Sequence, residues 1–105
     1  MNVYLCNAPE SAARRLATSL VQERLSACVN LLPGATSIYQ WEGTIENQTE
    51  TVLIIKSASP AKDIIARILE LHPYETPEIV CLGIDSSRSH KAYIDWVAAA
   101  STAGA

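Results

Sequence analysis

The extended segment Cys28–Trp41 constrains the fold of this chain more than any other feature. As a strand it would span about 45 Å at ~3.3 Å per residue, and Pro33-Gly34 within it implies a bulge or kink. The polar stretch 42–48 predicts a hairpin connection to a second strand over residues 50–56, which are mostly β-branched or apolar. The strand-like segments near the two ends of the chain reach about half as far, so they could not cover this pair along its whole length.

Two segments with helical periodicity flank the long hairpin. Pro9 suits the first turn of a helix whose apolar residues continue at helical spacing to near Ser26. Ser59 is the expected N-cap of a second helix, with Pro60 at its first position and Pro73 as its stop. Each helix has one apolar face, so both can pack on the same sheet.

Short strands precede the first helix and follow the second. Residues 1–7 and 79–84 are largely apolar and predict these strands, and Ser89 is the expected cap of a last helix. The order strand, helix, strand, strand, helix, strand, with an added C-terminal helix, is typical of the α+β ferredoxin-like sandwich. We expect one such domain over residues 1–97 and a frayed tail over residues 98–105.

Composition argues against several classes of protein. The net charge is −3 and Lys and Arg do not cluster, so a nucleic-acid partner is not expected. No apolar run reaches the ~20 residues that span a bilayer, so no membrane partner is expected. Arg14 and Arg15 follow the apolar start instead of preceding it, which is not the pattern of a signal peptide. Three widely spaced cysteines indicate reduced thiols in the cytoplasm.

The overhanging part of the long hairpin predicts self-association. Its ends would expose unpaired backbone groups and apolar side chains, including Ile38, Tyr39 and Trp41, and aromatic residues are favoured at interfaces. A symmetric oligomer whose hairpins pair between subunits removes this exposure. The alternative is that the kink at Pro33-Gly34 folds the hairpin back on its own domain. The edge-strand argument favours the oligomer.

Residues 72–78 carry the densest set of polar groups in the chain on a stiff path. Pro73 and Pro77 each fix their own φ and push the residue before them towards extended geometry. An imidazole, a phenol and two carboxylates therefore lie between an apolar helix and an apolar strand. The segment is either a functional loop or only the stop of one element and the start of the next.

A series of short motifs makes the chain recognisable. In order they are Ala27-Cys28-Val29-Asn30, Pro33-Gly34, Ser37-Ile38-Tyr39, Trp41, Gly43, Ile55-Lys56, His72-Pro73-Tyr74, Pro77-Glu78-Ile79 and Tyr93-Ile94-Asp95-Trp96. They resemble the CutA family of divalent-cation tolerance proteins in order and spacing from about Val3 to Val97. The resemblance implies a ferredoxin-like fold, a cytoplasmic homotrimer similar to PII signalling proteins, and binding of copper or other divalent metal ions in the response to them.

The resemblance also supplies candidate metal ligands. Some family members carry two adjacent histidines before the Pro-Tyr pair, proposed as copper ligands together with a cysteine on the first strand. Cys6 and His72 match that pattern, whereas Leu71 replaces the other histidine. A thiolate with an imidazole suits copper better than Mg²⁺ or Ca²⁺. Residues 85–89 and Gly83 also depart from the family's usual sequence.

The alternative to metal binding is a PII-like small-molecule sensor or regulatory module with no tight metal site. Lys56, Trp41, Tyr74, Glu75 and Glu78 could converge in a cleft between subunits, where pockets are favoured. Two carboxylates could also bind a hard cation through oxygen. The simpler roles are a strand-end lysine whose charge reaches solvent, and glutamates that are solvated or form ion pairs between subunits.

Catalytic function is not expected. The sequence contains no nucleophile–base pair, P-loop or zincin motif. A thiolate–imidazolium pair of Cys6 and His72 would be buried and would lack a third group. We therefore predict a protein that is not an enzyme, with no catalytic residues and no organic cofactor, whose partners are other copies of itself and a metal ion or small molecule. A purely structural trimer stays open as a further interpretation.

Overall fold

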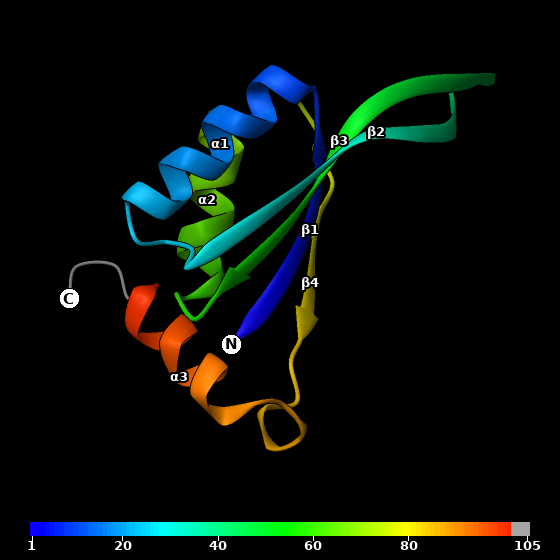
Figure 1. Ribbon diagram of the computed structural model, residues 1–105. Coiled ribbons are helices and arrows are strands. Elements are labelled where there is room, and N and C mark those ends of the chain that lie inside the picture. Colours follow the sequence, from blue (N-terminus) through cyan, green and yellow to red (C-terminus); the bar gives the residue numbers. More distant parts are fainter. Residues whose placement is uncertain (102–105) are drawn as a thin grey trace.

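A four-stranded antiparallel sheet in the order β2-β3-β1-β4 forms the centre of the computed structural model, which describes residues 1–101 (Figure 1). Helices α1 and α2 cover one face of the sheet, and α3 lies at one end of it. This order confirms the predicted ferredoxin-like α+β fold with an added C-terminal helix. The elements are β1 (Asn2–Ala8), α1 (Glu10–Gln22), β2 (Cys28–Trp41), β3 (Thr44–Ser57), α2 (Ala61–Leu71), β4 (Ile79–Gly83), the short 3₁₀ helix η1 (Ser86–Arg88) and α3 (Lys91–Ala100).

The core lies between the sheet and its two covering helices. Side chains on a strand alternate between the two faces of a sheet, so every second residue of β1 and β3 points towards α1 and α2. Each helix contributes one apolar face at helical spacing. The larger fully buried side chains of this core are Tyr4, Cys6, Leu16, Leu20, Leu53, Ile55, Ile64 and Ile68.

The β2–β3 hairpin is longer and more regular than the sequence suggested. Glu42 and Gly43 form its turn with φ values of 50° and 80°, the pair of positive values that a type I′ turn requires. The prediction of a polar connection over residues 42–48 was therefore wrong, because β3 begins at Thr44 and pairs with β2 from there. The half of the hairpin next to the turn, which we call its outer half, extends beyond the rest of the sheet (Figure 1). The exposed polar side chains of β3 in this half therefore resembled those of a loop.

The predicted irregularity at Pro33-Gly34 is confirmed. The strand register passes from Leu32 opposite Val52 to Ala35 opposite Glu50, so two residues of β2 face one residue of β3. Gly34 has a φ of 80°, which a residue with a side chain rarely adopts. One extra residue in a strand reverses the face to which the following side chains point. The bulge therefore turns the odd-numbered residues after it to the same face as Glu50.

Both predicted serine caps were wrong. Pro60 directly precedes α2, and the Ser59 hydroxyl donates instead to the backbone oxygen of Ser101. His90 directly precedes α3, and the Ser89 hydroxyl donates to the Asp85 backbone oxygen at 2.7 Å. Each hydroxyl has an acceptor outside the helix that it was expected to cap.

The chain beyond residue 97 is ordered further than the sequence suggested. Helix α3 continues to Ala100, and Ser101 is buried, with its hydroxyl accepting from the Ala58 N–H at 2.8 Å. The rest of the predicted frayed tail, residues 102–105, lies outside the described residues. No helix in residues 1–101 combines the length and apolar character needed to cross a membrane.

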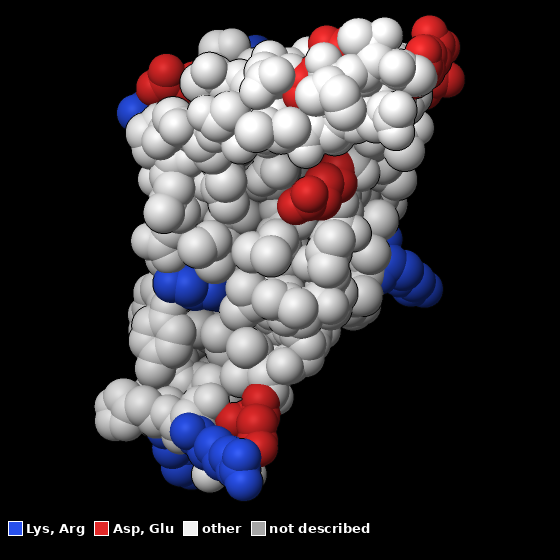
Figure 2. Space-filling view, turned by 90° about the vertical axis from the view of Figure 1, so that its right-hand side faces the viewer, with Lys and Arg blue, Asp and Glu red and all other residues white. Residues whose placement is uncertain are grey.

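The second face of the sheet carries no helix (Figures 1 and 2). Figure 2 views the molecule from this side and shows few charged side chains over the sheet. We call this surface the open sheet face. By strand alternation and register it carries aliphatic side chains from all four strands, namely Val3, Leu5, Leu32, Val52, Ile54, Val80 and Leu82.

Candidate functional site

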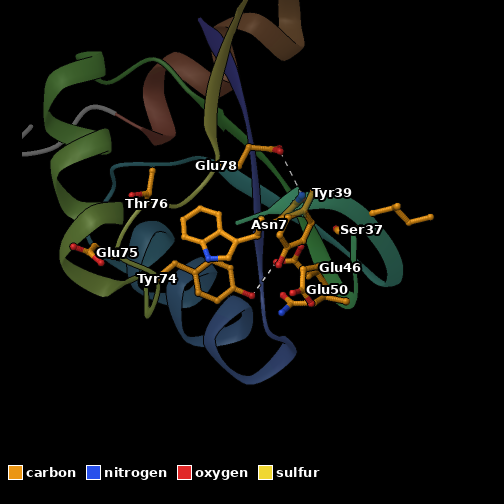
Figure 3. Close-up of a pocket in the computed structure, with 12 residues that line it drawn as sticks. Asn7, Ser37, Tyr39, Glu46, Glu50, Tyr74, Glu75, Thr76 and Glu78 are labelled. Carbon is orange, nitrogen blue, oxygen red and sulfur yellow. Dashed lines mark hydrogen bonds between the residues drawn. The ribbon is translucent and has the colours of Figure 1, made fainter. Parts of the chain in front are cut away.

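A cavity of about 850 Å³ lies between the outer half of the β2–β3 hairpin and residues 74–78, which lead into β4 (Figure 3). We call it the hairpin cavity. Its lining combines four carboxylates and three aromatic rings with uncharged polar groups and one aliphatic side chain. The lining residues are Asn7, Ser37, Ile38, Tyr39, Trp41, Glu46, Gln48, Glu50, Tyr74, Glu75, Thr76 and Glu78.

The hairpin wall of the cavity follows from strand alternation and the bulge. Glu46 and Glu50 occupy alternate positions of β3, so their side chains share a face. Tyr39 lies opposite Glu46, and Trp41 lies opposite Thr44. Without the extra residue in β2, the two aromatic residues would point to the other face.

The opposite wall is fixed by His72. Pro73 disfavours helical geometry for the residue before it, and His72 accordingly ends α2 in an extended conformation (φ −79°, ψ 135°). Its Nδ1 accepts from the Tyr74 N–H at 3.1 Å, so the ring proton is on Nε2, which donates to the Asn7 backbone oxygen at 2.8 Å. These two hydrogen bonds hold the start of the 74–78 segment against the end of β1.

Tyr74 and Glu50 connect the two walls. The Tyr74 hydroxyl donates to Glu50 Oε2 at 2.9 Å, as the dashed line in Figure 3 shows. Burial, followed by the hydrogen bond to Glu50 and the charge of that carboxylate, raises the pKa of Tyr74 to about 12. The phenol is therefore protonated at neutral pH and acts as a donor.

The cavity has charge of one sign. Four of its lining residues are glutamates, and none is Lys or Arg. Glu50 is the most enclosed of them, with 7% of its surface exposed. Glu78 accepts a long hydrogen bond from Asn7 Nδ2 at 3.5 Å. Within residues 1–101, no Lys or Arg side chain forms an ion pair with any of the four.

Four of the five residues expected in a cleft between subunits lie around this cavity of the single chain. Trp41, Tyr74, Glu75 and Glu78 line the cavity. Lys56 does not, because it lies six residues beyond Glu50 on β3, about 20 Å away at ~3.3 Å per residue. Its Nζ donates to Asn30 Oδ1 at 2.6 Å and lies 5.9 Å from the centre of the Tyr93 ring.

Sequence reasoning missed Asn7, Tyr39, Glu46 and Glu50 as lining residues. The signal for the two glutamates was their alternation along residues 44–50, which fits a strand that extends to the hairpin turn. Because residues 42–48 were assigned to a polar connection, this alternation was not used. Asn7 gave no signal, since only the fold brings β1 beside residues 74–78.

Cys6 and His72 do not fit a tight metal site within one chain in this conformation. Burial, followed by the charges of Glu78 and Glu50, raises the pKa of the Cys6 thiol to about 12, whereas metal ligation needs the thiolate. Both ring nitrogens of His72 already have hydrogen-bond partners. Among residues 1–101, no three His, Cys, Asp or Glu side chains are grouped closely enough to hold a metal ion.

Comparisons with known proteins agree on one family. The family model described as CutA1 divalent ion tolerance protein matches residues 2–100. The divalent-cation tolerance protein CutA of Pectobacterium atrosepticum is 45% identical over 97 residues, covering 90% of this chain and 86% of the relative. The protein of the same name from Thermus thermophilus is 43% identical, covering 90% and 92%. The solved structure of the PII-like protein CutA from Nostoc sp. PCC 7120 in apo form has a TM-score of 0.91 and 38% identity, covering 98% of this chain and 99% of that one.

Proposed function

Because the chain belongs to the CutA1 family of divalent ion tolerance proteins, we propose that it acts as a cytoplasmic homotrimer in the tolerance of divalent metal ions, copper among them. Family membership over nearly the whole chain is the observation that carries this proposal. A tolerance role requires no reaction, and we propose that the protein is not an enzyme. Three free cysteines among the described residues support a reducing compartment.

The open sheet face and the hairpin overhang support the trimer. Leu32, Val80 and Leu82 are each nearly half exposed in the single chain, and contiguous apolar surface of this kind marks interaction sites. The radius of gyration is 14.5 Å, whereas a compact chain of this length has about 13 Å. The excess comes from the overhanging hairpin, which neighbouring subunits would cover.

For the metal ion, we propose a site completed across subunits. Oxygen ligands suit hard divalent cations. The cavity glutamates supply oxygen ligands, and no buried thiol has to lose its proton as Cys6 would. Copper at Cys6 and His72, the pair implied by the family resemblance, would require His72 to give up one of its hydrogen bonds and Cys6 to ionise. The single-chain geometry therefore disfavours that pair, and a site at the glutamates needs further ligands from a neighbouring subunit, because residues 1–101 group no three His, Cys, Asp or Glu side chains closely enough.

Metal titration of the assembled protein tests these assignments. Cu(I), Cu(II) and Mn(II) are titrated by calorimetry into wild type, Cys6→Ala and Glu75→Gln/Glu78→Gln. The proposal predicts that Mn(II) affinity falls in the double glutamate variant and is unchanged in Cys6→Ala. Loss of copper binding in Cys6→Ala would instead assign copper to the thiol. Equal growth in metal of cells with and without the gene would contradict the tolerance role.

A second candidate function is a PII-like small-molecule sensor. The specific observation in its favour is the hairpin cavity, because about 850 Å³ lies within the range of ~300–1,000 Å³ typical of ligand pockets. A ligand that binds only the folded state raises the melting temperature. The sensor proposal therefore predicts a concentration-dependent shift with at least one small molecule, which Trp41→Leu reduces.

A further inference from the structure

Glu50 is a buried carboxylate without a charged partner in the described chain. Only 7% of its surface is exposed, and within residues 1–101 its carboxylate accepts one hydrogen bond, from the neutral Tyr74 phenol on Oε2. Buried charges in proteins are generally paired, and no Lys or Arg in residues 1–101 forms an ion pair with Glu50. A cation is the group that this carboxylate lacks.

The rest of the hairpin cavity favours positive charge as well. Glu46, Glu75 and Glu78 also line it, and no basic residue does. Figure 3 shows Glu46 and Glu50 together at one wall, with Glu75 at the opposite wall beyond Tyr74. A cleft lined by charges of one sign concentrates ions of the other sign.

The aromatic lining indicates which kind of cation fits. Tyr39, Trp41 and Tyr74 line the same cavity, and ammonium and guanidinium groups are attracted to the faces of such rings. A bare metal ion gains nothing from rings and needs several oxygen ligands in close reach, which residues 1–101 do not group together. The volume of about 850 Å³ is also far larger than one ion requires.

We propose that the hairpin cavity binds an ammonium or guanidinium group that pairs with Glu50 and packs against Tyr39, Trp41 and Tyr74. This inference rests on the sensor function proposed above and names the ligand class of that site. Two kinds of molecule carry such a group: a free small amine or guanidine, and a second copy of the chain through a Lys or Arg side chain.

Calorimetric titration with agmatine, which carries one guanidinium and one ammonium group, tests the free ligand. Saturable binding is expected for wild type, with uncharged 1,4-butanediol giving none. Glu50→Gln removes the charge at nearly constant shape and should weaken binding about tenfold or more, the size of one charge-assisted hydrogen bond. Trp41→Leu changes an exposed ring and should also weaken binding, so the test does not depend on Glu50→Gln folding. Glu10→Gln, an exposed glutamate on α1, is the matched control and should bind as wild type does.

Subunit assembly distinguishes the second source. In one outcome agmatine does not bind, but the Glu50→Gln oligomer separates into subunits at a higher protein concentration than the wild-type oligomer does in native mass spectrometry. The cation then belongs to a second copy. If Glu50→Gln and Trp41→Leu change neither agmatine affinity nor assembly, the inference is wrong. A melting-temperature screen of the same wild-type sample with uncharged and anionic small molecules separates this failure from that of the sensor function, since a shift with one of them rejects only the inference.

Discussion

His72 uses both ring nitrogens within its own chain. Nε2 binds the end of β1 and Nδ1 binds the backbone of Tyr74, so the ring positions one wall of the hairpin cavity. An imidazole whose two ring nitrogens both have backbone partners contributes mainly to structure. One of these partners, the Asn7 oxygen, lies 65 residues away, so the sequence around His72 does not reveal this role.

Replacing the two histidines tests this structural role. His72→Ala leaves the Asn7 oxygen and the Tyr74 N–H without partners, and each lost partner costs about 1–3 kcal/mol. We expect the free energy of unfolding to fall by about 2–4 kcal/mol in urea denaturation. His90→Ala, at the exposed start of α3, is the control and should change it by less than about 0.5 kcal/mol. Equal effects of the two substitutions would contradict the assignment.

Cys6 makes stability depend on alkaline pH. Its pKa rises from 9.0 to about 12 on folding because the thiol is buried, so the folded protein keeps a proton that the unfolded chain releases. The contribution is therefore fully present below pH 9 and is lost as pH rises towards about 12. Tyr74, raised from 10.0 to about 12, acts in the same direction above pH 10.

Urea denaturation at about pH 8 and about pH 10.5 measures this linkage. Wild type should lose stability between the two pH values, and Cys6→Ala should lose less, because the variant lacks the buried thiol whose pKa is raised in the folded state. The Cys6→Ala substitution lowers stability at both pH values by opening a small cavity, so only the difference between them is compared. An identical difference in wild type and variant would show that the Cys6 thiol does not carry the effect.

At the scale of elements, the bulge in β2 decides which side chains reach the cavity. Pro33 and Gly34 insert one extra residue into the strand, and the following side chains change face as a result. Tyr39 and Trp41 thereby join Glu46 and Glu50. A single backbone feature thus connects the sequence of β2 with the composition of the site.

Two glycine substitutions isolate the strain at this bulge. A Cβ added at Gly34 or at Gly83 meets no atom within 4 Å, but only Gly34 has a positive φ, of 80°. Gly34→Ala should therefore lower the free energy of unfolding by about 1–2 kcal/mol. Gly83→Ala should change it by less than about 0.5 kcal/mol. Similar values for the two variants would show that the bulge tolerates a side chain without strain.

The sequence predicted those features that depend on local pattern. Helical spacing and β-branched runs identified each helix and strand, and Pro33-Gly34 identified the bulge. The outer part of β3, residues 44–49, was missed because its side chains are mostly exposed, so it lacks the apolar alternation of a half-buried strand. The role of Ser59 was missed because its acceptor, Ser101, lies 42 residues away.

The same reasoning explains the partial success at the site. Residues 72–78 stood out through their prolines and polar groups, and three of them line the hairpin cavity together with Trp41. Lys56 was wrongly grouped with them, because sequence does not tell which end of a strand a distant loop approaches. The burial of Glu50 depends on the hairpin and the 74–78 segment together.

At the scale of the whole molecule, the single chain leaves a large apolar surface uncovered. Val80 and Leu82 are each 46% exposed on the open sheet face, and the hairpin extends beyond the strands that could pair with it. Three copies related by symmetry would cover both features.

A charged substitution on each side of the sheet tests which surface drives assembly. Leu82→Asp places a carboxylate on the open sheet face and should shift the protein towards single subunits, because a buried unpaired charge is costly at an interface. Leu69→Asp is the control, since Leu69 is similarly exposed (51%) but lies on α2 on the opposite side. Native mass spectrometry should show intact assembly for Leu69→Asp alone. Equal assembly of both variants would place the interface elsewhere.

Sedimentation velocity of the wild-type protein over a dilution series measures whether the folded chain exists as a single subunit. We expect one folded species with about three times the single-chain mass of 11.4 kDa, persisting at the lowest concentration that can be measured. A soluble single subunit with native circular dichroism would contradict it, because that subunit would be stable with its sheet face and hairpin uncovered.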